Sequence, residues 1–238
     1  MTIVIIGLSI TSSWGNGHAS TYRALIRGLA SRGHRVVFLE RDTPWYAENR
    51  DLPDPPYCRV GLYTDVQELD RRYGEAIAAA DLVIVGSYVP DGVAAIDVAL
   101  RRASGPTAFY DIDTPVTLTL LQGQGAEYID RRQIPRFDLY LSFTGGPTLD
   151  RLERRFGARL ARPLYCSVDL EIYRPELPDA TDIDLGYLGT YSTDRQPTLD
   201  ALLVAPARAW SAGRFLVAGA QYPDTISFPD NVQRVIHL

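Results

Sequence analysis

A histidine that follows a glycine-containing loop is the residue of this chain best suited to exchange a proton near neutral pH. It ends the stretch Gly15-Asn16-Gly17-His18, and apolar residues recur at helical spacing directly after it. Glycine lets a backbone approach a ligand closely, and the free N–H groups at a helix start favour an anion or a polar oxygen. We therefore expect His18 to face a crevice, where an imidazole with an ordinary pKa of about 6.5 can change its protonation state. The alternative is a structural histidine that bonds a loop carbonyl.

Polar residues also follow two further apolar runs. Asp111 and Asp113 end the run at 107–111, and alternation would point both carboxylates to one side if the chain stayed extended. Tyr88 follows the run at 82–85. Because parallel sheets bind ligands at the carboxyl ends of their strands, we expect the two carboxylates near the crevice. For Asp113, capping of a helix that starts at Thr114-Pro115 is an equally good interpretation.

The elements that must position these residues form a repeating pattern of strand and helix. Helical spacing is found directly after His18 and at 65–80, 93–102 and 147–156, with Asp65 as a plausible N-cap and Gly33 as a cap of the first helix. Strands are predicted at 3–10, 35–39, 59–63, 82–85, 107–111, 139–143 and 160–166. This alternation predicts an α/β fold with a doubly wound, Rossmann-like parallel sheet.

Two loops of this pattern have features of their own. Residues 41–57 contain four prolines together with Trp45 and Tyr46, which predicts a long irregular loop that forms one wall of the binding crevice. Gly145 and Gly146 precede the helix at 147–156, and we expect a second group of backbone N–H donors there. Residues 116–136 show no single pattern.

Composition describes an ordinary globular protein. Apolar residues make up 46%, charged residues 22%, and the net charge is −5. No clustered basic face is evident, so we expect no nucleic-acid partner. Cys58 and Cys166 are far apart and lack metal-ligand spacing, which predicts free thiols, no metal site and a cytoplasmic location. No apolar run reaches the roughly 20 residues of a membrane span, and the first residues lack the features of a signal peptide.

The first loop differs from the dinucleotide-binding fingerprint. Glu40 stands at the end of the second predicted strand, where such folds place the carboxylate that holds a ribose. The sequence Gly-x-Gly-x-x-Gly is absent, however, and a long Ser/Thr-rich insertion separates Gly7 from Gly15. We therefore expect neither a nicotinamide nor a flavin cofactor.

Two later stretches carry a resemblance to a known family. Cys166-Ser167-Val168-Asp169-Leu170-Glu171-Ile172-Tyr173-Arg174-Pro175 resembles the Gly-Val-Asp-x-x-x-Phe-x-Pro segment that closes the N-terminal domain of many GT-B glycosyltransferases. The stretch Leu185 to Ser192 looks like the first strand and phosphate loop of their C-terminal domain. Together with Gly-Asn-Gly-His and Tyr-Asp-Ile-Asp-Thr-Pro, the chain most resembles the CgeB-like, spore-maturation type of GT-B enzyme over nearly its whole length.

The resemblance implies a glycosyltransferase with a nucleotide-sugar donor as substrate and without a bound cofactor or metal. His18 and Asp113 would be catalytic, with His18 in the place of the histidine that some members use as a base. Acceptor-binding residues would be Gly15, Asn16, Gly17, Tyr88, Asp111, Gly145 and Gly146. Donor-binding residues would be Gly189, Thr190, Tyr191, Arg195 and Gly219.

The resemblance also implies a division of the chain. We expect an acceptor-side domain at 1–175, a linker at 176–183 and the incomplete start of a donor-side domain at 184–238, since one βαβ unit already uses about 30 residues. The chain alone is then expected to be inactive and open to self-association or to a complementing chain. The alternative is a non-catalytic sugar- or nucleotide-binding or assembly protein that keeps only the acceptor cleft. A sugar-nucleotide epimerase is a weaker possibility, because the dinucleotide fingerprint is missing.

Overall fold

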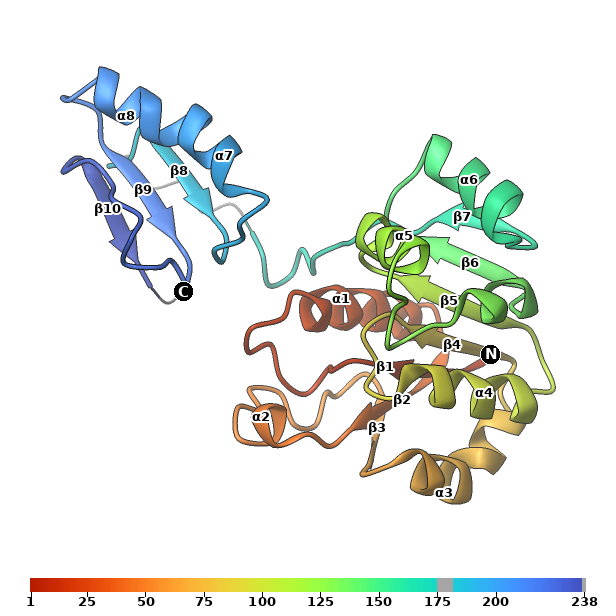
Figure 1. The fold of residues 1–238 in the computed structure, drawn as a ribbon. Coiled ribbons are helices and arrows are strands. Elements are labelled where there is room, and N and C mark those ends of the chain that lie inside the picture. The colour runs from red at the N-terminus through yellow and green to blue at the C-terminus, as the bar shows by residue number, and fades with distance from the viewer. Residues whose placement is uncertain (175–181, 237–238) are drawn as a thin grey trace. The chain divides into compact units, whose positions relative to one another are not determined.

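The chain folds into two compact units, residues 1–174 and 175–238 (Figure 1). The structure is a computed structural model that describes residues 1–174 and 182–236. Residues 176–181 of the expected linker lie outside the described residues. Unit 1 contains a seven-stranded sheet and unit 2 a three-stranded sheet, and every strand pair in both sheets is parallel.

The sheet of unit 1 has the order β3-β2-β1-β4-β5-β6-β7. Its strands are β1 (Thr2–Gly7), β2 (Arg35–Arg41), β3 (Arg59–Tyr63), β4 (Leu82–Gly86), β5 (Thr107–Asp111), β6 (Leu139–Ser142) and β7 (Ala161–Pro163). The strands at 59–63 and 107–111 match the prediction. β1 ends at Gly7 rather than at Ile10, because the chain bends into the crevice loop while Ile10 stays buried.

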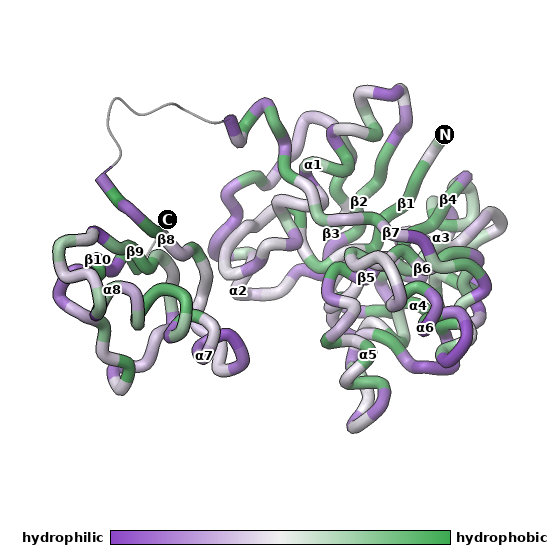
Figure 2. Tube along the Cα trace, turned by 90° about the horizontal axis from the view of Figure 1, so that it is seen from above, coloured by the Kyte–Doolittle hydropathy of each residue, from purple (hydrophilic) through white to green (hydrophobic). Residues whose placement is uncertain are grey.

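Helices cover both faces of this sheet (Figure 1). They are α1 (His18–Ser31), α2 (Pro44–Ala47), α3 (Val66–Ala78), α4 (Gly92–Arg102), α5 (Thr114–Gln122), the 3₁₀ helix η1 (Arg131–Arg136) and α6 (Pro147–Phe156). Tyr22 and Ile26 of α1 pack on one face in a cluster with Phe38. Leu69 of α3 and Leu152 of α6 belong to the cluster on the other face. Hydrophobic residues run along the central strands, as expected of a sheet covered on both faces (Figure 2).

Local signals fix several helix ends. Asp65 accepts a hydrogen bond of 2.7 Å from the backbone N–H of Glu68, which confirms it as the N-cap of α3. Gly33 has φ +81° directly after α1, the left-handed position that glycine tolerates best. The loop at 41–57 contains the short helix α2, and the segment without a clear pattern holds α5 and η1.

Unit 2 is a small layer of helix on sheet with the strand order β10-β9-β8. Its elements are β8 (Leu185–Leu188), α7 (Gln196–Leu199), the π-helical turn η2 (Asp200–Val204), α8 (Ala205–Ala209), β9 (Phe215–Ala218) and β10 (Val232–Val235). α7, η2 and α8 form one continuous helical segment. Leu203, Phe215 and Val217 form its core. None of the described helices is long and apolar enough to cross a bilayer.

Candidate functional site

The strand order of unit 1 has a topological switch point between β1 and β4. The chain leaves β1 for β2 and β3 on one side and returns to β4 on the other side, so the connections after β1 and β4 run in opposite directions. Ligands of doubly wound folds bind at such a switch point, outside the carboxyl ends of the strands. His18 begins α1 after β1, Tyr88 follows β4, and Asp113 follows β5.

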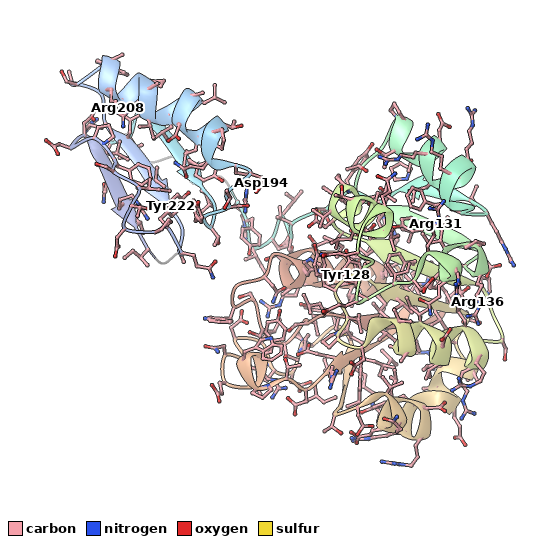
Figure 3. All side chains as sticks on the ribbon, viewed as in Figure 1. Tyr128, Arg131, Arg136, Asp194, Arg208 and Tyr222 are labelled. Atoms are coloured by element: carbon pink, nitrogen blue, oxygen red, sulfur yellow. The ribbon has the colours of Figure 1, made fainter. Side chains whose placement is uncertain are left out.

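These three predicted residues come together. The ring of His18 meets the ring of Tyr88 edge-on, with centroids 5.3 Å apart and an interplanar angle of 83°. The hydroxyl of Tyr88 donates a hydrogen bond of 2.9 Å to Oδ2 of Asp113. A fourth residue, Tyr128, packs against Tyr88 with centroids 4.6 Å apart (labelled in Figure 3). Sequence reasoning missed Tyr128, because its segment had no pattern that placed it near the crevice.

The backbone of Tyr88 is left-handed, with φ +62°. A bulky aromatic residue rarely adopts this conformation, which costs of order 1–3 kcal/mol and persists only where the surroundings hold it. The rings of His18 and Tyr128 and the carboxylate of Asp113 provide those contacts. Strain of this kind is concentrated at functional sites, so Tyr88 marks the crevice independently of the family resemblance.

His18 is a neutral imidazole at pH 7. Burial lowers its pKa to about 4, and the nearby Asp113 carboxylate opposes this shift. Its Nδ1 is buried without a hydrogen-bond partner, and no hydrogen bond joins His18 to any described loop carbonyl. The described residues therefore do not show the structural alternative, in which His18 bonds a loop carbonyl.

Asp113 occupies the N-cap position of α5 without using its side chain as a cap. The carboxylate instead accepts the hydrogen bond from Tyr88, while the backbone carbonyl of Asp113 receives the N–H of Thr117. The capping interpretation thus holds for the backbone position and fails for the side chain. A carboxylate beside a neutral imidazole stabilises the imidazolium that forms when the imidazole accepts a proton.

Asp111 has a structural role in unit 1. The chain turns after β5, so Asp111 and Asp113 do not point the same way. The side chain of Asp111 is fully buried and accepts hydrogen bonds from Tyr140 Oη (2.6 Å), Thr117 Oγ1 (2.8 Å) and the Asp113 backbone N–H (3.1 Å). Burial outweighs these donors and raises its pKa to about 6. We correct the expectation that this carboxylate faces an acceptor: it fixes the start of α5.

The loop before α1 is shaped by its own polar groups. Oδ1 of Asn16 accepts the backbone N–H of Ala19 at 3.0 Å, and its Nδ2 donates to the carbonyl of Ser12, so Asn16 serves the loop and the helix start. Gly15 has φ +63°, which requires a residue without Cβ strain. Within the described residues, the backbone N–H groups of Gly17 and His18 have no protein acceptor and remain free for a ligand.

Glu40 anchors the loop before α1 through hydrogen bonds to Ile10 and Thr11. It is fully buried at the end of β2, where Oε2 accepts the backbone N–H groups of Ile10 (2.7 Å) and Thr11 (3.1 Å) and Oε1 accepts the Thr11 hydroxyl (2.6 Å). Dinucleotide-binding folds place a ribose-binding carboxylate at this position, whereas here the carboxylate clamps a loop. The sequence offered one signal for this role, a charged residue directly after a run of buried strand residues.

Arg23 and Asp51 tie the same loop to the proline-rich segment. Two guanidinium nitrogens of Arg23 donate to the two oxygens of Asp51, at 2.8 and 2.9 Å. Asp51 also accepts the backbone N–H and the hydroxyl of Ser13. These donors lower the pKa of Asp51 well below its usual range. In the expected wall, Tyr46 is buried and Trp45 is exposed.

Gly145 and Gly146 lie at the start of α6. Gly146 is the residue before the helix and has φ +63°, while a Cβ on Gly145 would meet the hydroxyl of Tyr165 at 2.5 Å. No described contact joins either glycine to His18, Tyr88 or Asp113. Their expected role in acceptor binding remains a prediction.

The expected donor-binding residues gather at the carboxyl ends of β8 and β9 in unit 2. The N–H of Gly189 donates to the carbonyl of Ala218, and a Cβ on Gly219 would lie 2.1 Å from the carbonyl oxygen of Gly189. Tyr191 packs edge-on against Tyr222, with centroids 5.6 Å apart. Thr190 and Arg195 are exposed, with Arg195 directly before α7. Figure 3 labels Asp194 and Tyr222 of this region.

Arginines of η1 and α6 lie over one aromatic ring. Arg131 and Arg151 lie over the ring of Phe156, at 4.9 and 5.9 Å from its centroid, and Arg131 donates to the backbone carbonyl of Arg155. Tertiary structure thus produces a local group of basic side chains that sequence analysis did not expect. The prediction about nucleic acid stays open.

Comparison with known proteins shows the fold. No protein-family model and no curated protein matches the chain. An α-glucosyltransferase solved with UDP and a DNA containing an HMU base is similar over 99% of this chain and 67% of its own, with 11% identity and a TM-score of 0.59. Anabaena HepE in complex with UDP-glucose is similar over 100% and 69%, with 12% identity and a TM-score of 0.61.

A third similar structure is a Listeria monocytogenes protein assigned as a UDP-N-acetylglucosamine 2-epimerase, over 100% of this chain and 69% of its own, with 11% identity and a TM-score of 0.51. The chain therefore has the Rossmann-like fold of GT-B proteins and spans about two thirds of these neighbours' lengths. At sequence identities this low, the similarity shows the fold alone. Any argument about the chemistry must come from the residues of the site.

Proposed function

We propose that this chain belongs to a glycosyltransferase that moves a sugar from a nucleotide-sugar donor to a hydroxyl of its acceptor. The observation that carries the proposal is the group His18, Tyr88 and Asp113 at the switch point of the sheet, with an unpartnered imidazole nitrogen and a nearby carboxylate. Neighbours solved with UDP or UDP-glucose support the same class of donor. The CgeB-like subfamily rests on the sequence motifs alone.

In the proposed reaction, His18 accepts the proton of the acceptor hydroxyl. The hydroxyl oxygen forms a bond to the anomeric carbon of the donor sugar, and the bond from that carbon to the diphosphate oxygen breaks. Asp113 stabilises the resulting imidazolium, since its charge already favours the protonated form of His18. Proton transfer by a positioned side chain contributes about 10²–10⁴-fold to such rates.

For the donor, we propose the loop after β8. Backbone N–H groups near Gly189 and Thr190, together with the guanidinium of Arg195, have the chemistry that holds a diphosphate. Tyr191 and Gly219 would shape the same loop. The reaction as proposed needs the donor as substrate and no protein-bound cofactor.

A non-catalytic role in sugar or nucleotide binding is the second candidate, and one observation favours it. A histidine with a pKa of about 4 is a weaker base than an ordinary histidine, because burial has removed much of its affinity for a proton. A protein that only binds an acceptor would not be affected by that loss. Measurements of turnover and of binding separate the two candidates.

The test combines nucleotide binding with transfer. We would titrate the chain with UDP and UDP-glucose while following backbone amides by NMR, and assay release of nucleotide with a panel of sugar donors and hydroxyl acceptors. UDP is expected to shift the amides of Gly189 and Thr190. Arg195→Gln should weaken UDP binding about tenfold, as expected for loss of a charged hydrogen bond. Arg208→Gln, on the exposed side of α8, is the control.

For the acceptor side, His18→Gln should lower kcat by at least about 100-fold with little change in nucleotide affinity. The matched control is His34→Gln, which lies at the opposite end of the sheet, before β2. Binding without turnover would favour the non-catalytic candidate. Turnover that survives His18→Gln unchanged would refute the assignment of His18 as the base.

A further inference from the structure

A cavity lies at the opposite end of the sheet from the group His18, Tyr88 and Asp113. It is lined by residues at the amino ends of β1, β2 and β3 and by the last turns of α3, and its volume is about 600 Å³. Because β1 is six residues long, about 17 Å of strand separates the two ends of the sheet. Every residue that lines this cavity belongs to unit 1, and none belongs to the group around His18.

The register of the sheet produces this cavity. β3 begins with Arg59 opposite Val37, so Arg35 and Val36 extend beyond β3 without a strand partner on that side. The space left at this corner is open between β2, α3 and the segment that leads into β3. A volume of this size falls within the range of about 300–1,000 Å³ that small-molecule sites occupy.

Two arginines at the cavity lack a carboxylate partner. Arg35 donates one hydrogen bond, from Nη2 to Thr2 Oγ1 at 3.0 Å, and forms no ion pair with a described residue. The side chain of Arg59 forms neither a hydrogen bond nor an ion pair with any described residue. Both side chains are exposed, whereas many other arginines of unit 1 are matched with Asp or Glu. Their positive charge is therefore available to an anion.

The rest of the cavity lining is mainly apolar, and it includes one histidine nitrogen without a hydrogen-bond partner. Val37, Ala76 and Ala79 contribute aliphatic surface, and the core residues Val4 and Val36 lie at its base. His34 also lines the cavity, and its Nδ1 is buried without a hydrogen-bond partner. A buried polar atom of this kind normally has a partner in a native protein.

We infer that this cavity is a binding site for a small organic anion, one with an aliphatic body and a terminal carboxylate or phosphate. The aliphatic body would cover the valine and alanine surface, while Arg35 and Arg59 would hold the anionic group through charge-assisted hydrogen bonds. The inference is independent of the proposed transferase activity, since it involves other residues at the other end of the sheet.

Cys58 provides a direct reporter, because it lines the cavity and is one of only two cysteines. Burial, with a smaller effect of Asp54, raises the pKa of its thiol to about 11, so alkylation is best followed at alkaline pH. Cys166 is exposed and does not line the cavity, which makes it an internal control in every reaction.

The experiment measures the rate at which N-ethylmaleimide alkylates each cysteine, by peptide mass spectrometry, in the presence of octanoate, octyl phosphate, inorganic phosphate or octanol. Octanoate and octyl phosphate should slow the reaction of Cys58 in a saturable manner and leave Cys166 unchanged. Octanol at the same concentrations should give much weaker protection, because it lacks the charge. Comparison of octanoate with octyl phosphate decides between a carboxylate and a phosphate headgroup.

Variants test the two halves of the site. Arg59→Gln and Arg35→Gln should each weaken octanoate protection about tenfold, and Ala76→Leu should block it by filling the aliphatic part. Arg154→Gln, at an exposed position of α6, should have no effect. Equal protection by octanol, no protection by any compound, or unchanged protection in both arginine variants would overturn the inference. Unchanged thermal melting and Cys166 reactivity verify that each variant is folded.

Discussion

Tyr88 joins the two groups of the candidate site that carry the proposed chemistry: its hydroxyl bonds Oδ2 of Asp113 at 2.9 Å, and its ring contacts the ring of His18. One side chain in a strained conformation therefore sets the position of both an imidazole and a carboxylate. The left-handed backbone of Tyr88 persists only while these contacts hold it. Substitutions at Tyr88 should therefore change the positions of His18 and Asp113.

Tyr88→Phe removes the hydrogen bond and retains the ring contacts. We expect the free energy of unfolding of unit 1 to fall by about 1 kcal/mol, the usual value of one hydrogen bond. Transfer activity should fall through kcat rather than KM, because Asp113 is no longer oriented. Tyr73→Phe is the matched control, since the Tyr73 hydroxyl donates a bond of the same length, 2.9 Å, to the Leu62 carbonyl away from the crevice. Equal effects of both variants on kcat would exclude a positioning role for Tyr88.

The protonation of His18 can be observed without activity. Its pKa is lowered to about 4 by burial, against the attraction of Asp113. Asp113→Asn removes that attraction, so we expect the pKa of His18 to fall further. The chain contains only three histidines, so NMR titration of the imidazole protons, assigned with His18→Gln, gives a direct measurement. An increase in the pKa of His18 in the variant would contradict the arrangement described above.

His18 and Asp111 are expected to change stability with pH in opposite directions. The pKa of His18 is lower in the folded chain, so acidification from about pH 6.5 to 4 protonates the unfolded chain first and destabilises the fold. The pKa of Asp111 is raised to about 6, so its contribution is fully present below its usual 3.8 and is lost as the pH rises through 6. His18→Gln removes only the first effect.

The His18→Gln variant should therefore gain stability relative to the native chain when the pH falls from 7 to 4.5. Urea unfolding of both proteins at the two pH values measures this difference, and any constant effect of the lost ring contact cancels. A gap that stays constant with pH would show that burial does not depress the pKa of His18.

Much of this architecture could be predicted from local sequence. The strands at 59–63 and 107–111 and the helix at 147–156 have the expected bounds, because short apolar runs and a Gly-Pro start specify them without long-range information. Tyr88 was expected in the site through the family resemblance, His18 through the glycine loop and helix start, and Asp113 through a topological rule about the ends of parallel strands. None of these expectations used contact information.

Other features depend on partners that are distant in sequence. Asp111 and Glu40 looked like ligand-binding carboxylates because both follow strands, yet Tyr140 and the Thr11 backbone occupy their oxygens. Whether a carboxylate at a strand end faces the crevice or the interior depends on the register of neighbouring strands. The left-handed backbone of Tyr88 likewise depends on Tyr128, which is 40 residues away in the chain.

Glu40 should support the crevice loop through stability alone. Glu40→Gln replaces one acceptor oxygen by a donor that faces the N–H groups of Ile10 and Thr11, and we expect it to cost about 1–3 kcal/mol. Glu75→Gln is the control, because Glu75 is exposed on α3 without an ion pair to a described residue. Hydrogen exchange should speed up at Ile10 and Thr11 in the first variant. Protection that is equal in both variants would contradict the clamp.

The close approach of Gly219 to Gly189 gives a sharp test of the loop proposed to bind the donor. In Gly219→Ala, the new Cβ would meet the Gly189 carbonyl oxygen at 2.1 Å, at a backbone φ of +148° that alanine disfavours. The ends of β8 and β9 must then separate, at a cost of about 2–4 kcal/mol. The matched variant is Gly186→Ala in β8, where the nearest atom, Cβ of Leu216, is 3.8 Å away and φ is ordinary. Hydrogen exchange at Val217 should accelerate strongly in Gly219→Ala and remain unchanged in Gly186→Ala, with loss of UDP binding in the first variant alone. If both variants kept native exchange and bound UDP equally, the packing of Gly219 against Gly189 would have no part in shaping a donor loop.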